Sequence, residues 1–126
     1  MSEVRETVGA GELLEALAEY AAKANASPRV RKTLTGWTCR IHIQATDTGD
    51  ARFTLEVAGG QVSPPAAGLH AVPDLVVRGH SMDLAEIFWG DANPVSNYMQ
   101  GAIKTQGRAD DVMRLDAMAM FVFLNQ

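Results

Sequence analysis

The stretch of sequence that decides the fold is residues 74–107, which read DLVVRGHSMDLAEIFWGDANPVSNYMQGAIKTQG. It opens with a short apolar run from Asp74 to Gly79, which predicts a strand. Ser81 can then cap a helix that continues to Trp89, and Gly90 ends that helix. Strand and helix therefore follow each other directly in this part of the chain.

The second part of this stretch predicts a further helix and a further strand. Asn93-Pro94 puts proline in the first turn of a short helix that ends near Gln100-Gly101. Residues 102–106 then predict a strand, and Gly107 turns the chain.

A final helix is predicted from Asp110 to about Leu124. Asp110 and Asp111 suit the positive end of the helix dipole. The first turns are amphipathic, but the last two are apolar all round, which an exposed helix should not be. Such an end must be covered by the protein's own core, a bound ligand, a partner chain or a membrane. Five of the six methionines lie in this half of the chain, and their flexible side chains adapt to irregular apolar partners.

Before residue 74, the chain predicts two helices and then three strands. Apolar residues recur at helical spacing over residues 12–24, and Ser27-Pro28 starts a second, short helix. Strict alternation over residues 37–46 predicts a strand with a buried inner face and a wet outer face.

Two more strands complete this half. Residues 52–57 alternate with Phe53 and Leu55 inward, and Gly59-Gly60 connects them to a short strand around residues 61–63. The first half is therefore an antiparallel meander behind a helix. A loop over residues 64–73, rich in proline and glycine, joins it to the second half.

Length and composition suit one soluble domain over residues 1–126. The chain is 47% hydrophobic and 21% charged, and its net charge of −4 argues against binding nucleic acid or an anionic membrane by charge alone. Its single cysteine, Cys39, allows no internal disulfide and is expected to be a small buried residue. We see neither a signal peptide nor an apolar run of the ~20 residues needed for a membrane span, and expect a cytoplasmic protein.

The residues that could do chemistry form no recognisable catalytic set. His42, His70 and His80 have no second histidine or cysteine at metal-ligand spacing, and each is expected to be solvated or structural. No nucleophile elbow, phosphate-binding loop or dinucleotide fingerprint is present. The acidic pairs Asp110-Asp111 and Asp83/Glu86 fit first helical turns. The sequence therefore predicts no enzyme, no metal and no cofactor.

Residues 74–124 nevertheless resemble, as an ordered set, the sterol carrier protein type lipid-binding domain. The shared features are the strand DLVVRG, the helix LAEIFWG, the step Asn93-Pro94, the turn and strand MQGAIK, Gly107 and a closing helix rich in Met and Leu. The first half fits too, with FTLEV at residues 53–57 before a glycine turn. The chain ends without a peroxisomal Ser-Lys-Leu signal, which favours a bacterial-type cytoplasmic protein.

The resemblance implies a five-stranded, mainly antiparallel sheet with helices covering one face and an apolar tunnel between the layers. Fatty acids, fatty acyl-CoA, sterols or phospholipids would bind there without chemistry. The expected tunnel residues are apolar side chains of the sheet and the later helices, namely Phe53, Leu55, Phe88, Met99, Ile103, Met113, Met118, Phe121 and Val122. The candidates for contacting a charged head group are Arg29, Arg31, Lys32 and Arg40.

Two other functions stay open. In the first, the domain is a dimerisation or scaffolding module, and the apolar end of the last helix packs on a partner chain. In the second, it is an enzyme with a recruited pocket, which the lack of a catalytic set disfavours. The expected partners are thus a lipid or other apolar small molecule, no nucleic acid, at most transient membrane contact, and a monomer or homodimer. The sequence leaves open which lipid binds, whether side chains fill the tunnel, and what the loop over residues 64–73 does.

Overall fold

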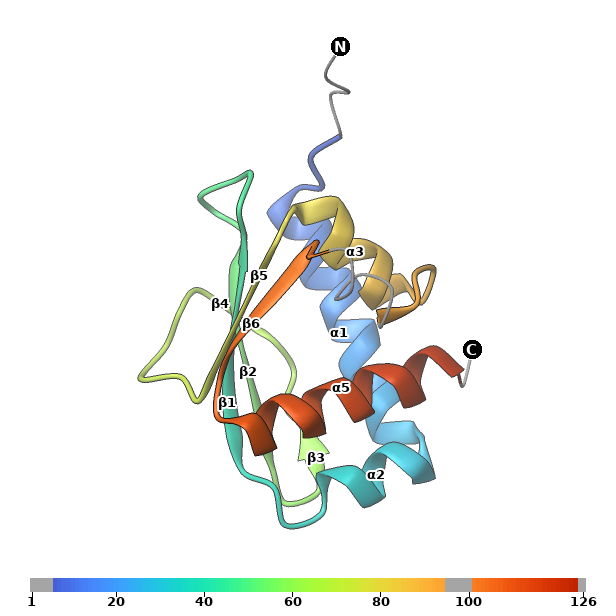
Figure 1. The fold of residues 1–126 in the computed structure, drawn as a ribbon. Coiled ribbons are helices and arrows are strands. Elements are labelled where there is room, and N and C mark those ends of the chain that lie inside the picture. Colours follow the sequence, from blue (N-terminus) through green and yellow to red (C-terminus); the bar gives the residue numbers. More distant parts are fainter. Residues whose placement is uncertain (1–5, 95–100, 125–126) are drawn as a thin grey trace.

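The computed structural model describes residues 6–94 and 101–124, which form a sheet and a layer of helices (Figure 1). The helices are α1 (Ala10–Ala26), α2 (Pro28–Leu34), α3 (Ser81–Trp89) and α5 (Ala109–Leu124). The strands are β1 (Cys39–Ala45), β2 (Arg52–Ala58), β3 (Gln61–Val62), β4 (Ala66–Ala67), β5 (Leu75–Gly79) and β6 (Ile103–Gly107). Most of the helix predicted after Asn93-Pro94 lies outside the described residues.

The sheet has the strand order β3-β2-β1-β5-β6, and the short strand β4 also pairs with β2. β1 pairs in parallel with β5, while the other pairs are antiparallel. The predicted α+β fold, with a mainly antiparallel sheet and helices on one face, is therefore confirmed. β4 was not predicted, because two alanines within a Pro/Gly-rich loop carry no alternation signal.

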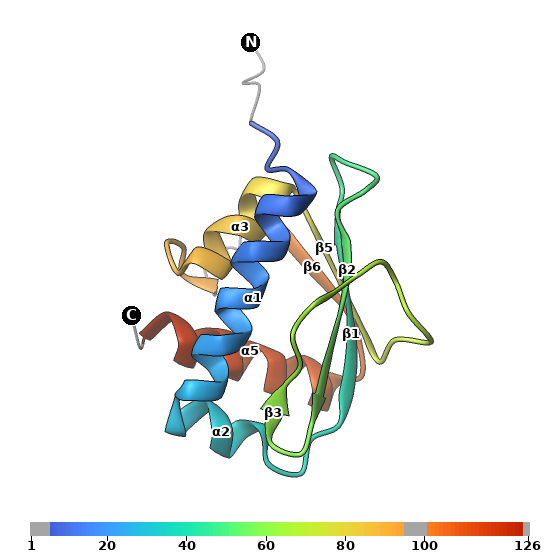
Figure 2. The same ribbon diagram turned by 180° about the vertical axis from the view of Figure 1, so that it is seen from behind.

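The inner face of the sheet is built by the alternation seen in the sequence. Ile41, Ile43, Phe53 and Leu55 are each at most 4% exposed, and the register pairs Ile41 with Leu55 and Ile43 with Phe53. The four helices of the described residues lie on this side (Figures 1 and 2). The core therefore lies between one face of the sheet and the helices.

The outer face of the sheet is not wet throughout, which corrects the prediction from alternation. The loop over residues 64–73 folds back along this face (Figure 2) and leaves His42 and Thr54 each only 5% exposed. A His42 ring nitrogen lies 2.9 Å from the carbonyl oxygen of His70. The Thr54 hydroxyl accepts a hydrogen bond from the His70 amide and donates one to the Gly68 carbonyl. Polar outward residues thus bind the loop's backbone.

The cap of α3 also differs from the prediction. His80, not Ser81, is the N-cap residue, and its Nδ1 accepts a hydrogen bond from the Met82 amide at 3.1 Å. Ser81 is fully buried, and its hydroxyl has protein partners there: it donates to Asp47 Oδ2 at 2.7 Å and accepts from the Val8 amide at 2.8 Å. Ser81 therefore joins the start of α3 to the β1–β2 loop and the segment before α1.

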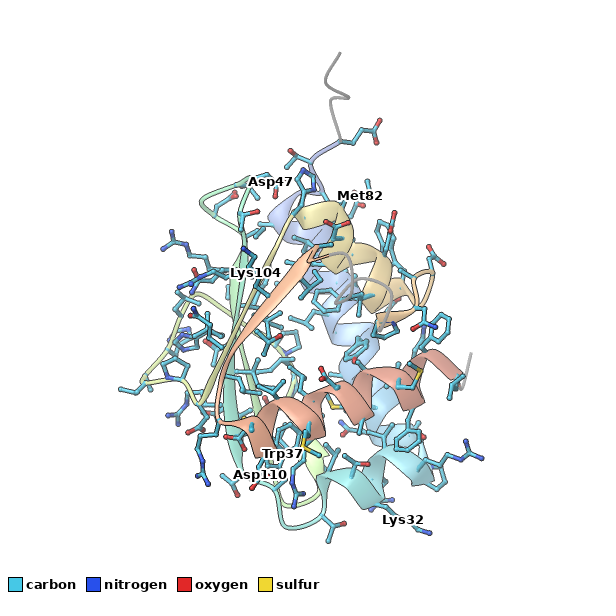
Figure 3. The ribbon with its side chains drawn as sticks, in the orientation of Figure 1. Lys32, Trp37, Asp47, Met82, Lys104 and Asp110 are labelled. Atoms are coloured by element: carbon cyan, nitrogen blue, oxygen red, sulfur yellow. The ribbon has the colours of Figure 1, made fainter. Side chains whose placement is uncertain are left out.

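α5 begins beside the approach to β1. Trp37 Nε1 donates a hydrogen bond to Asp111 Oδ1 at 2.9 Å, and Figure 3 shows Trp37 next to the first turn of α5 near Asp110. The Arg114 guanidinium donates to the Thr33 carbonyl at the end of α2. These two contacts hold α5 against α2 and the sheet, where Met118 and Val122 enter the core.

Candidate functional site

An apolar pocket lies between the inner face of the sheet and the helices α1, α3 and α5. Its lining consists of Leu17, Tyr20, Ile41, Ile43, Leu55, Val77, Leu84, Ile87, Phe88, Pro94, Ile103, Leu115, Met118 and Ala119. Among the described residues that line the pocket, Tyr20 alone carries a side-chain oxygen or nitrogen. The rings of Tyr20 and Phe88 stack at a tilt with their centroids 5.6 Å apart. The pocket therefore offers hydrocarbon surface rather than hydrogen bonds.

The pocket is small, with a volume of about 50 Å³. One water needs roughly 10–15 Å³ on the same measure, and drug-sized pockets run to about 300–1,000 Å³. Side chains therefore fill most of the space between the layers, and a through-going tunnel stays a prediction. Ile87 and Leu115 are the only lining side chains of this group that are large, aliphatic and only half-buried, so they mark its solvent edge.

The structure brings part of the predicted tunnel set to this pocket. Leu55, Phe88, Ile103 and Met118 line it. Phe53 and Val122 are buried in the core outside the lining, and Phe121 packs against that core.

Two predicted tunnel residues stand apart from the rest. The Met113 side chain is 67% exposed on α5, so the conformation described here does not bring it to the interior. Met99 lies outside the described residues.

The other lining residues were missed, although their signal was present. Ile41, Ile43 and Val77 belong to inward strand faces that the alternation identifies correctly. Leu17 and Tyr20 follow the helical spacing of α1. The sequence does not predict that α1 packs against α3. This packing places the apolar face of α1 and the inward strand faces around one pocket.

The four head-group candidates do not gather at the pocket. Arg31 and Lys32 line a separate open groove of about 640 Å³, together with Trp37 and the β2–β3 turn. Figure 3 shows Lys32 on α2 pointing away from the molecule, and Arg29 is exposed on the same helix.

Arg40 lies elsewhere, on the outer face of the sheet. Its Nε donates to Glu56 Oε1 at 2.7 Å. The sheet therefore separates Arg40 from the apolar pocket. No contact of Arg40 with the described residues supports the prediction that it binds a lipid head group.

The remaining chemistry-bearing groups have structural surroundings. Burial, followed by the negative charges of Asp111 and Asp74, raises the pKa of the Cys39 thiol to about 12, so it stays protonated at neutral pH. Among residues 6–94 and 101–124, no group of three His, Cys, Asp or Glu side chains could hold a metal ion.

Asp47, Ser81 and His80 lie together but in the wrong order for a nucleophilic triad. Asp47 stands between the other two, with its Oδ2 2.7 Å from the Ser81 hydroxyl and 3.3 Å from His80 Nε2. A triad needs the histidine between the serine and the carboxylate. Burial alone would raise the pKa of Asp47, but hydrogen bonds from the side chain and backbone of Ser81 and from Thr7 lower it below the usual value. The cluster is therefore a charged structural clasp.

A mixed sheet with helices on one face and an apolar pocket between the layers is an architecture suited to small-molecule binding. Its family is set by sequence: the profile of the SCP-2 sterol transfer family matches residues 14–120, and the chain belongs to that family. No curated protein matches the chain at a significant level.

Solved structures agree on the fold. A crystal structure of sterol carrier protein 2 superposes with a TM-score of 0.64 at 18% identity, covering 89% of this chain and 91% of that one. The solution structure of palmitated SCP2L2 from Aedes aegypti gives a TM-score of 0.59 at 17% identity, covering 89% and 95%.

A much longer protein contains the same fold. An inverting sec-alkylsulfatase from Pseudomonas sp. gives a TM-score of 0.55 at 16% identity, covering 72% of this chain and 14% of the sulfatase. The fold thus occurs both in carrier-type proteins and as a part of an enzyme. In the part of this chain that the structure describes, no helix is both long and apolar enough to cross a membrane.

Proposed function

We propose that the protein binds the hydrocarbon part of a lipid, without chemistry, in the apolar pocket between the sheet and α1, α3 and α5. The observation that carries this proposal is the apolar lining: among residues 6–94 and 101–124, its members have one side-chain oxygen or nitrogen between them, that of Tyr20. The family supports it, and so does the likeness to an insect relative described as palmitated. A fatty acid or fatty acyl ester is the ligand class we favour, with sterols and phospholipids as further members.

A long acyl chain needs more room than the pocket's volume of about 50 Å³, so lipid binding requires side chains of the pocket to move. Met118 is suited to this, because its unbranched side chain adopts other rotamers at low cost. Each methylene removed from water contributes about 0.8 kcal/mol, which can offset such repacking over several carbons. Ile87 and Leu115 stand at the solvent edge of the pocket, and we assign them as the side chains past which the acyl chain enters.

The test is a titration of a fluorescent fatty acid into the native protein and two variants. Ala119→Leu adds carbons inside the pocket, whereas Ala117→Leu makes the same change on α5 outside its lining. Loss of space for about two methylenes weakens binding roughly tenfold. We expect this loss in Ala119→Leu alone, with its melting temperature at or above the native value. Equal binding by native and Ala119→Leu protein, or no binding by native protein, refutes the proposal.

A specific observation favours a second candidate, the packing of α5 on a second copy of the chain. Met113 and Leu124 are 67% and 60% exposed, and they lie 11 residues apart, about three turns, on one face of α5. Ala117 and Met120, both half-buried, fall between them on that face. Native mass spectrometry separates the two functions. Dimerisation is favoured over lipid binding if the native protein is a dimer without bound lipid and the Met113→Glu variant is a monomer.

A further inference from the structure

A row of cations crosses the outer face of the sheet, opposite the apolar pocket. The register pairs Gln44 of β1 with Arg52 on one side and with Arg78 on the other, and it pairs Arg78 with Lys104 of β6. Each of the four side chains follows or precedes a buried inward residue of its strand, and the three cations are exposed. Figure 3 shows Lys104 pointing away from the helices. Arg52, Gln44, Arg78 and Lys104 therefore form one cross-strand row, which we name the cationic row.

The cationic row is not neutralised within the described part of the molecule. Arg52, Arg78 and Lys104 make no ion pair within 4 Å there, and Arg78 only approaches the Gln106 amide oxygen at 3.4 Å. Like charges that face each other across a strand pair are destabilising. The chain has 11 basic and 15 acidic residues, so three unpaired cations in one row, two of them directly opposite each other, depart from its general charge. An anionic partner would remove this repulsion.

The row also borders an open hollow of about 440 Å³. Arg52, Arg78, Gln44 and Thr46 line it, together with the β1–β2 loop over residues 47–49. Arg52 and Arg78 flank Gln44 from the two neighbouring strands, so their Cα atoms are about 10 Å apart. Guanidinium groups on side chains of that length can converge above Gln44. Asp47 is the one carboxylate among the described residues of this lining, and both its oxygens accept hydrogen bonds from Ser81.

We infer that this hollow is a binding site for a phosphate group, held by Arg52 and Arg78 with the amide of Gln44 and the hydroxyl of Thr46. Guanidinium forks match phosphate oxygens in pairs, and a phosphate accepts enough hydrogen bonds to use all of these donors. Lys104 lies one strand beyond Arg78 and adds charge without lining the hollow. The sheet separates this site from the apolar pocket, so its ligand is not the head group of a chain buried there.

The test is a titration of isotope-labelled protein with inorganic phosphate and inorganic pyrophosphate, followed by NMR at physiological ionic strength. We expect shifts confined to residues 44–52, 76–79 and 103–105. Arg52→Gln and Arg78→Gln should each weaken pyrophosphate binding about tenfold or more, since each removes charge-assisted hydrogen bonds. Lys104→Gln should have a smaller effect. Lys23→Gln, which removes the same charge from the exposed side of α1, is the matched control and should bind as the native protein does.

A second arm identifies the source of the phosphate. Sedimentation with phosphatidylcholine vesicles is compared with and without phosphatidic acid. Capture by the acidic vesicles that Arg52→Gln abolishes supports the site and assigns it to a lipid head group, while binding of the free anions alone supports the site and assigns it to a soluble phosphate ester. The inference is overturned if neither form binds at millimolar concentration, if Lys23→Gln weakens binding equally, or if Arg52→Gln and Arg78→Gln bind normally. None of these results depends on fatty acid binding in the apolar pocket.

Discussion

Trp37 Nε1 and Asp111 Oδ1 are joined by a 2.9 Å hydrogen bond that links the segment before β1 to the first turn of α5. The two residues are 74 positions apart in the chain. The indole is buried, at 4% exposure, so its N–H has little access to water as an alternative partner. This bond fixes one end of the helix whose middle lines the apolar pocket.

Loss of that bond should destabilise the protein. Asp111→Ala leaves the buried indole N–H without its acceptor, which costs about 1–3 kcal/mol. Asp110→Ala is the matched control, because Asp110 is exposed and occupies the same helical turn. Urea unfolding should separate the two variants by at least about 1 kcal/mol in the free energy of unfolding. Equal midpoints for both variants would show that only the helix dipole matters here.

The Asp47 clasp should make stability depend on acid pH. The pKa of Asp47 is lowered in the folded state, so its contribution is present above the unfolded value of about 3.9 and is lost as the pH falls through the lower folded value. Asp47→Asn should therefore be less stable than native protein at neutral pH by about 1–3 kcal/mol, because it weakens the bonds to Ser81.

Thermal unfolding from neutral pH downward checks this. The difference between native and Asp47→Asn protein should shrink on the acid side of pH ~3.9. Glu15→Gln, a matched change at an exposed position of α1, should follow the native curve throughout. A difference that is constant with pH would mean that the charge of Asp47 is not what stabilises the fold.

Gly107 at the end of β6 should tolerate no side chain. A Cβ there would lie 2.6 Å from the carbonyl oxygen of Asp74 and would also collide with Leu75. Gly107→Ala must therefore push β6 away from β5, and overpacking of this kind costs about 1–3 kcal/mol. Gly49→Ala, where a Cβ meets nothing within 4 Å, serves as the control. Chemical denaturation should show a lowered midpoint for Gly107→Ala only.

Thr54 should hold the outer loop in place. Thr54→Val keeps the shape of the side chain but removes the hydroxyl that binds the His70 amide and the Gly68 carbonyl. We expect faster hydrogen exchange at residues 68–72 and a loss of about 1–3 kcal/mol in global stability. Thr38→Val, at an exposed position just before β1, should change neither quantity. Unchanged exchange at His70 in Thr54→Val would contradict the proposed role.

The sequence predicted what depends on local periodicity. Inward positions such as Ile41 and Phe53 follow from alternation alone, and Ser27-Pro28 begins α2 as expected, with Ser27 accepting from the Val30 amide. His42 and Thr54 alternate in the same way, yet a loop 10 or more residues away covers them. Periodicity predicts which face of the sheet a residue lies on. It does not predict whether a distant loop folds back over that face.

The candidate site was harder to predict for a related reason. Apolar residues of α5 were expected to line one interior space, but α5 turns Met118 inward and Met113 outward. Both are methionines on a helix rich in apolar residues, so composition could not separate them. The cationic row could not be predicted for a different reason. Arg52, Arg78 and Lys104 are far apart in sequence, and only the strand order brings them into one row.

The central place of β1 has a consequence for biosynthesis. Its parallel partner β5 begins at Leu75, which pairs with Ile41, so a nascent chain that has emerged only as far as the outer loop holds β1 with one open edge. Such an edge is a template for pairing with other chains. The protein is thus most exposed to aggregation while residues 39–74 are outside the ribosome and β5 is still inside. A translational pause at the stage when residue 74 has emerged but β5 has not should lower the yield of folded protein. A pause after residue 107 has emerged should not.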